Sequence, residues 1–143
     1  MLKSICQVAS VLSIAASAVW ADGDRPAGLL SGKNKEDLPE IILSVGEPLG
    51  DPWVLHSGTY YEVEITSDGS GEIGLDSDGF FRAIWIDEIV IEGLEIRPMG
   101  VHSVEFDRPG TMEIGFIAIK PGRYTLKIPG STNDGQRLDI TIE

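Results

Sequence analysis

Apolar and polar residues alternate along the last third of the 143-residue chain, and a short turn follows each alternating run. The runs occupy residues 112–119, 124–128 and 138–143, and Lys120-Pro-Gly122 separates the first two. A period of two places one set of side chains on one face of a β-strand. This part of the chain is therefore expected to form short strands, each with one buried face.

The same pattern predicts strands in the middle of the chain, at residues 41–45, 61–66, 72–75, 89–91 and 104–106. Residues 46–52 are rich in turn formers and predict a loop, and Ser67–Gly71 predicts the turn of a hairpin. Seven or eight short strands at this spacing predict an all-β sandwich or barrel.

One segment, Asp78–Glu88, interrupts the alternation. It has few turn formers, and Phe81, Ile84 and Trp85 recur at helical spacing. A short helix or helical turn is predicted there, with Asp78 as a possible cap, and a bulged strand is the competing interpretation.

The N-terminus has the features of a secretory signal peptide over residues 1–21. Met1–Lys3 is positively charged, residues 8–19 are apolar, and Ala21 ends a small-residue cleavage pattern. An uncleaved membrane anchor is the alternative, but the apolar run is shorter than the ~20 residues that span a bilayer. A flexible leader over 22–39, a folded domain over 40–143, and a periplasmic or secreted location are predicted.

Cleavage would remove Lys3 and Cys6, leaving 10 basic and 23 acidic residues, a net charge of −13 and no cysteine. Disulfides, zinc–thiolate sites, iron–sulfur clusters and a thiolate nucleophile are then excluded. The negative charge disfavours binding to nucleic acid or to anionic lipid. No nucleic-acid partner, and no membrane insertion after cleavage, is expected.

Two runs, Val104-Glu-Phe-Asp107 and Phe116–Leu126, resemble strands of the cupredoxins, the small β-sandwiches that usually hold one copper ion. The resemblance covers roughly Gly58–Glu143. It implies a Greek-key β-sandwich or barrel of cupredoxin type, with seven or eight strands and one short helix.

The chemistry of that family does not follow from this resemblance. The last loop, residues 129–137, contains no Cys, His or Met, and the resemblance places Gln136 about where the axial copper ligand lies. A blue-copper centre requires a thiolate, so none is expected. No cofactor is predicted, and copper is the candidate metal for an alternative site.

That alternative metal site is a loose copper site built from His102, Met99 and His56. The competing interpretation leaves both histidines in solvent. The segment Asp76–Gly79 matches half of a calcium loop, although the same spacing is common in turns.

A cluster of aromatic residues is the other candidate site. Trp, Phe and Arg are enriched at interface hot spots, so Trp85, Phe80 and Arg82 are predicted to bind a partner. The competing interpretation is that the aromatic residues here belong to the core.

We therefore predict a non-catalytic exported module that docks on another exported protein. The resemblance suggests a redox or metal-handling partner. The alternative function is a periplasmic copper carrier with a non-standard His/Met site. A small hydrolase is a third hypothesis, and no motif supports it.

Overall fold

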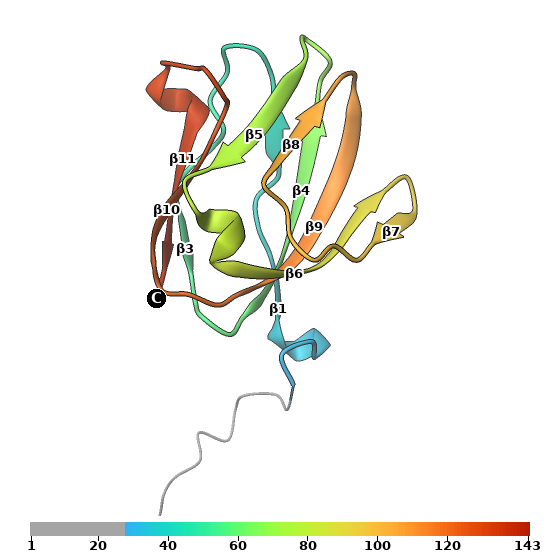
Figure 1. The fold of residues 1–143 in the computed structure, drawn as a ribbon, viewed down its shortest axis with the longest axis vertical. Helices are drawn as coiled ribbons and strands as arrows, with labels where there is room; N and C mark the ends of the chain where they lie inside the picture. The colour runs from blue at the N-terminus through green and yellow to red at the C-terminus, as the bar shows by residue number, and fades with distance from the viewer. Residues whose placement is uncertain (1–27) are drawn as a thin grey trace, which may run out of the picture.

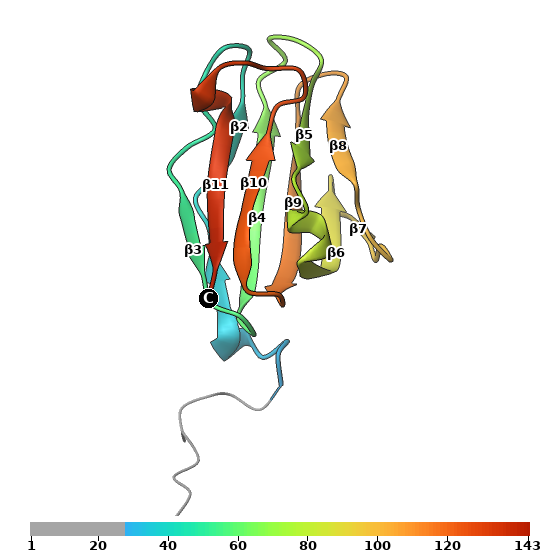
Figure 2. The same ribbon diagram turned by 60° about the vertical axis from the view of Figure 1, so that its left-hand side comes forward.

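The computed structural model describes residues 28–143, which form two facing β-sheets (Figures 1 and 2). The predicted signal peptide, residues 1–21, lies outside the described residues, as does the leader up to residue 27. Within residues 28–143 no helix is long and apolar enough to cross a membrane. The described helical segments are three 3₁₀ turns, η1 (Gly32–Asn34), η2 (Phe80–Arg82) and η3 (Asp134–Gln136).

The six-stranded sheet has the order β1-β4-β9-β6-β7, with β2 also pairing to β4. Its strands are β1 (Lys35–Asp37), β2 (Ile41–Leu43), β4 (Tyr60–Ser67), β6 (Ile84–Ile91), β7 (Leu94–Ile96) and β9 (Gly110–Ala118). The five-stranded sheet has the order β3-β11-β10-β5-β8. Its strands are β3 (Trp53–Leu55), β5 (Ile73–Ser77), β8 (Ser103–Phe106), β10 (Gly122–Lys127) and β11 (Arg137–Ile142). Both sheets are mixed, and together they confirm the predicted sandwich.

The core lies between the sheets and follows the period of two. In β4, Tyr61, Val63 and Ile65 are buried, while Glu62 and Glu64 face outward. Phe116 of β9 pairs with Tyr61, and their rings lie 5.8 Å apart. The alternation in β4, β9 and β11 thus predicted the correct inward set.

The outward face of β9 departs from the expected pattern, because Gly115 and Ile117 are buried there as well. Tyr60 covers this part of the sheet, and a Cβ added to Gly115 would lie 2.2 Å from the Tyr60 hydroxyl oxygen. That hydroxyl lies 3.4 Å from Asp87, to which it donates a hydrogen bond. A larger residue at position 115 would therefore have to displace the Tyr60 side chain.

The predicted hairpin around Ser67–Gly71 is wrong. The strand before this turn, β4, belongs to the six-stranded sheet, whereas β5 pairs with β8 and β10 in the other sheet. The turn therefore carries the chain from one sheet to the other. Turn residues mark a reversal but not the partner of the next strand.

The helix predicted over Asp78–Glu88 is limited to the single turn η2, after which the chain continues directly as β6. The pairing of β6 with β9 is irregular between Ile86 and Glu88, so the competing bulged strand describes most of the segment. The residue before the turn is Gly79, at φ 90°, and it makes no side-chain cap. Asp78 instead accepts hydrogen bonds from Lys127 and Thr125.

The predicted flexible leader also needs correction within its described part. Lys35–Asp37 form β1, which pairs in parallel with β4, and Lys35 makes an ion pair with Glu62. Asn34 donates hydrogen bonds to the carbonyl oxygens of Leu29 and Gly58, at 2.8 and 2.9 Å. Residues 28–37 are therefore attached to the sandwich.

Candidate functional site

The two histidines of the predicted copper site lie on opposite sides of the molecule. His56 directly follows β3 and His102 directly precedes β8, and these strands are the two edges of the five-stranded sheet. Four strand spacings separate them, or roughly 19 Å. His56 lies 3.7 Å from Glu143 and is exposed. The structure therefore does not bring His56 and His102 together.

Met99 and His102 remain close in sequence, and both side chains are exposed. His102 borders a hollow of about 230 Å³ that Phe81 and Arg82 also line. The Arg82 guanidinium is permanently charged, and a positive charge at this hollow opposes the binding of a metal cation. The surroundings of His102 thus disfavour a metal ion.

The last loop contains its own polar network. Gln136 is buried, and its side-chain oxygen accepts a hydrogen bond from the Ser131 hydroxyl. Asn133 accepts a hydrogen bond from the Gly135 amide at 2.9 Å and donates one to the Gly46 carbonyl at 3.3 Å. Because these groups bond to one another and the loop has no thiolate or imidazole, its donor set does not fit a blue-copper centre.

The acidic pair resembling half of a calcium loop makes hydrogen bonds within the protein, Asp76 to the chain beside it and Asp78 to β10. Asp76 accepts a hydrogen bond from the Ser77 amide at 2.7 Å. Asp78 makes an ion pair with Lys127 at 2.8 Å, and the hydrogen bond from Lys127 lowers the pKa of that carboxyl. Both carboxylates thus have protein partners, which the interpretation without a metal requires.

The predicted aromatic patch is divided between the core and the surface. Phe80 is 2% exposed and meets Phe116 edge to face, with ring centroids 5.6 Å apart, so its assignment to a partner surface is wrong. Trp85, by contrast, is 48% exposed, and Arg82 is exposed. The two kinds of environment arise because Phe80 lies in η2, which packs against β6 and β10, whereas Trp85 lies on the outward face of β6.

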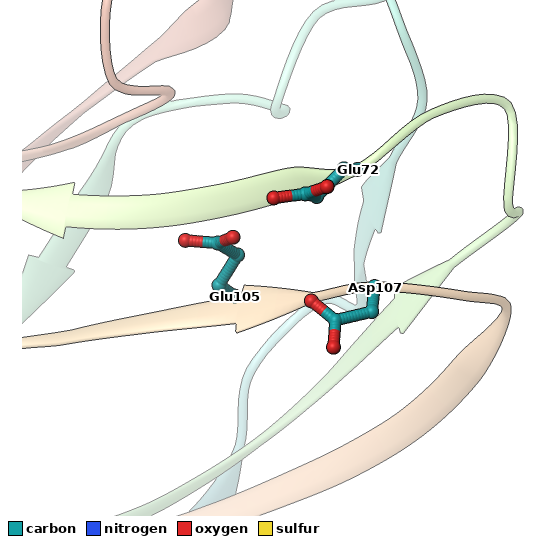
Figure 3. Close-up of side chains that lie close together, drawn as sticks. All are labelled: Glu72, Glu105 and Asp107. Carbon is teal, nitrogen blue, oxygen red and sulfur yellow. The ribbon is translucent and has the colours of Figure 1, made fainter.

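Sequence reasoning missed a group of three carboxylates at the β5–β8 edge. Glu72 precedes β5, Glu105 lies in β8 and Asp107 follows it, and their oxygens lie within 4.8 Å of one another. Figure 3 shows Glu72 and Glu105 facing each other from the two chain segments, with Asp107 beside them. Hydrogen bonding with Glu72 is the main cause that raises the pKa of Glu105, and the negative charge of Glu72 is the second. A cationic group placed here would relieve that repulsion.

Sequence reasoning also missed the exposed apolar hairpin formed by β6 and β7. Every residue of β7 is exposed, and Leu94 is 63% exposed. Ile91 and Ile96 are also exposed, and Met99 follows the hairpin fully exposed. In Figure 1 the hairpin projects from the edge of the six-stranded sheet. Only residues 89–91 of β6 were predicted as a strand. The Glu92-Gly93 turn, followed by the alternation of Leu94, Glu95 and Ile96, was the signal that could have revealed the hairpin.

A cluster of charges ties β7 to β6 on the outward face. Arg97 follows β7 and makes ion pairs with Asp87 at 3.0 Å, Glu88 at 2.9 Å and Glu95 at 3.2 Å. Three carboxylates surround one guanidinium, so the base of the hairpin keeps a net negative charge. The hairpin is thus positioned by a charged cluster while its apolar side chains stay exposed.

No family model matches the sequence, and no curated protein matches it. Among solved structures, a multi-copper oxidase from Pseudomonas thermotolerans matches with a TM-score of 0.54 at 14% identity, over 77% of this chain and 30% of that one. A blue copper oxidase from Nitrosomonas europaea matches with a TM-score of 0.52 at 14% identity, over 66% of this chain and 31% of that one. Fet3p, a multicopper oxidase that functions in iron import, matches with a TM-score of 0.51 at 12% identity, over 63% of this chain and 20% of that one.

These neighbours establish the fold. Multicopper oxidases contain cupredoxin-like domains, and the described residues form a cupredoxin-like β-sandwich, as the resemblance implied. The chain spans a third or less of the length of these neighbours. Identities this low carry the fold alone and assign no activity to this chain.

Proposed function

We propose that this protein is a non-catalytic, exported, cupredoxin-like module that docks on another exported protein. The observation that carries the proposal is the β6–β7 hairpin, a projecting element whose apolar side chains face solvent. Exposed apolar residues that are contiguous, with a polar rim, are typical of interaction sites. The carboxylates around Arg97 and the three carboxylates at the β5–β8 edge supply such a rim.

The proposed docking surface differs from the surface predicted from the sequence. Phe80 supports the core, while Trp85 and Arg82 remain exposed and available to the same partner or to another one. The hairpin offers more exposed apolar side chains than the Trp85 region, because Ile91, Leu94 and Ile96 extend along one face. The resemblance makes a redox or metal-handling protein the first partner class to examine.

Site-specific crosslinking in the exporting cell tests this function. A photo-crosslinking residue replaces Leu94, and a matched control replaces Val54, which is 62% exposed on β3 at the far edge of the other sheet. A discrete adduct from position 94 that position 54 does not give supports docking through the hairpin. Adducts of equal pattern from both positions, or none from position 94, contradict it.

Copper titration tests the alternative function. The purified protein and its His102→Ala variant are titrated with Cu(I) and Cu(II) in a calorimeter. Submicromolar binding that His102→Ala abolishes would establish a copper carrier and overturn the docking module. We expect only weak heats that are equal in the two proteins, because His102 lines the same hollow as Arg82 and lies far from His56.

A further inference from the structure

The apolar side of the β6–β7 hairpin is an extension of the core face of the six-stranded sheet. Ile89 is buried in the core and pairs with Ile96, and Ile91 pairs with Leu94. Directly paired residues, and residues two apart in a strand, share a face, so all four side chains lie on the same side. The facing sheet ends at the four-residue strand β8, which leaves this part of the core face uncovered.

The outer edge of the hairpin has backbone groups available for pairing. Its turn consists of Glu92 and Gly93, at φ 49° and 79°, which is the sign pattern of a two-residue type I′ turn. Such a turn makes Ile91 and Leu94 a hydrogen-bonded pair, so the alternation of an antiparallel ladder directs the amide and carbonyl of Glu95 away from β6. In residues 28–143, β7 pairs with β6 alone. The Glu95 edge is thus open to an added strand.

A groove continues this surface past the tip of the hairpin. The hairpin groove, with a volume of about 480 Å³, lies between the hairpin tip and the turn that joins β8 to β9. Its apolar part includes Ile91 and Phe106, and its charged residues are Glu92, Glu105, Asp107 and Arg108. Glu72 adds a further carboxylate beside Glu105. Arg108 is the single basic residue among these five charged groups, so the groove is acidic.

The charge of the groove decides between two kinds of occupant. A second copy of this chain would bring the same carboxylates against one another, and the chain has a net charge of −12. Like charges placed together oppose association, whereas a cationic segment is attracted. The raised pKa of Glu105 agrees with this, because hydrogen bonding with Glu72 raises it first and the negative charges of Glu72 and Asp107 raise it further.

We propose that the β7 edge and the hairpin groove bind an extended segment of the partner protein in which Lys or Arg residues alternate with apolar residues. The backbone of that segment pairs with the Glu95 edge. Beside β7 its apolar side chains cover Leu94 and Ile96, and the alternate cationic side chains face Glu95 on the other side. Past the hairpin tip, where the segment leaves the sheet edge, its cationic side chains reach the carboxylates of the groove. This inference rests on the proposed docking function and adds the chemistry of the partner.

The test uses synthetic peptides and the full mature protein. A peptide of about nine residues in which Lys and Val alternate spans β7 and the groove at ~3.3 Å per residue. Matched peptides alternate Glu with Val, or Lys with Ser. We expect the Lys–Val peptide to bind ~10-fold or more tightly than either control, and to weaken with added salt. Backbone amide shifts are expected at residues 91–96 and 105–110.

Two matched pairs of variants locate the binding. Leu94→Thr is expected to lower the affinity for the Lys–Val peptide ~5-fold or more, whereas Val54→Thr leaves it unchanged. Glu95→Pro, which removes an edge amide without removing a β6–β7 hydrogen bond, is expected to weaken binding beyond Glu95→Gln, which keeps the amide.

A third pair separates local charge from net charge. The triple variant Glu72→Gln/Glu105→Gln/Asp107→Asn is compared with Glu36→Gln/Glu47→Gln/Asp51→Asn, which changes the net charge equally at exposed sites that do not line the groove. The groove variant alone is expected to lose affinity. Equal losses in both variants, or equal binding of the Lys–Val and Glu–Val peptides, overturn the inference. A position-94 crosslink in the cell would then keep the docking function and reject only this partner chemistry.

Discussion

Replacing Phe80 with Ala distinguishes most sharply between a core residue and a docking residue at the η2 turn. Phe80 is 2% exposed, and a Phe side chain buries about 200 Å². At ~25 cal/mol per Å² its burial contributes up to about 5 kcal/mol, and the measured range for such truncations is about 3–5 kcal/mol. For a domain of this size, that loss lowers Tm by ~12–20 °C.

The assay is thermal and urea unfolding of the mature protein, followed by circular dichroism. Trp85→Ala is the matched control, because Trp85 is 48% exposed and its truncation is expected to cost about 2 kcal/mol or less. A free energy of unfolding for Phe80→Ala within about 1 kcal/mol of wild type would refute the placement of this ring in the core.

Two further perturbations test particular contacts. Gly115→Ala is expected to lower the free energy of unfolding, measured in urea, by about 1–3 kcal/mol, because its new Cβ meets the Tyr60 hydroxyl. Adding Tyr60→Phe to the same chain should recover part of this loss. If nothing is recovered, the contact is rejected. Glu105→Gln is expected to raise Tm at pH 7 and to have less effect at about pH 3. The raised pKa of Glu105 means that the folded state holds its proton more tightly, so stability falls as pH rises from the ordinary value of 4.5 through the raised value. An equal effect of Glu105→Gln at both pH values would contradict the repulsion by Glu72.

Local alternation was sufficient to predict the strands that have one regular buried face. β9 and β11 repeat apolar residues at every second position, and the Pro121-Gly122 turn separates β9 from β10. The resemblance to cupredoxins used these same strands, so the fold class followed from them. The pairing of these strands with their neighbours in the sheets did not follow from the alternation, because pairing is decided by contacts between distant segments.

The β6 segment was misread because two structural elements meet within it. A 3₁₀ turn buries Phe80 and Phe81, and the strand that follows is irregular between Ile86 and Glu88. Together they place apolar residues at intervals that imitate a helix. The same misreading hid the start of β6. The hairpin that we propose as the docking surface was missed for a different reason, because no strand was predicted after residues 89–91.

Most residues of the candidate site could not be predicted from the sequence. Glu72 and Glu105 lie far apart in the sequence and meet because β5 pairs with β8, with Gly74 opposite Glu105. The exposed face of β7 depends on where the second sheet ends, which no local pattern encodes. The lack of thiolate in the last loop was readable directly, because it depends on composition alone.

The most direct measurement is the affinity of the purified partner recovered by the position-94 crosslink for wild-type protein and for Leu94→Thr and Val54→Thr. Both sites are more than half exposed, so neither substitution is expected to unfold the protein. Docking through the hairpin predicts a Kd that rises ~5-fold or more for Leu94→Thr and stays within ~2-fold of wild type for Val54→Thr. Equal affinities for all three proteins would show that the hairpin is not the docking surface.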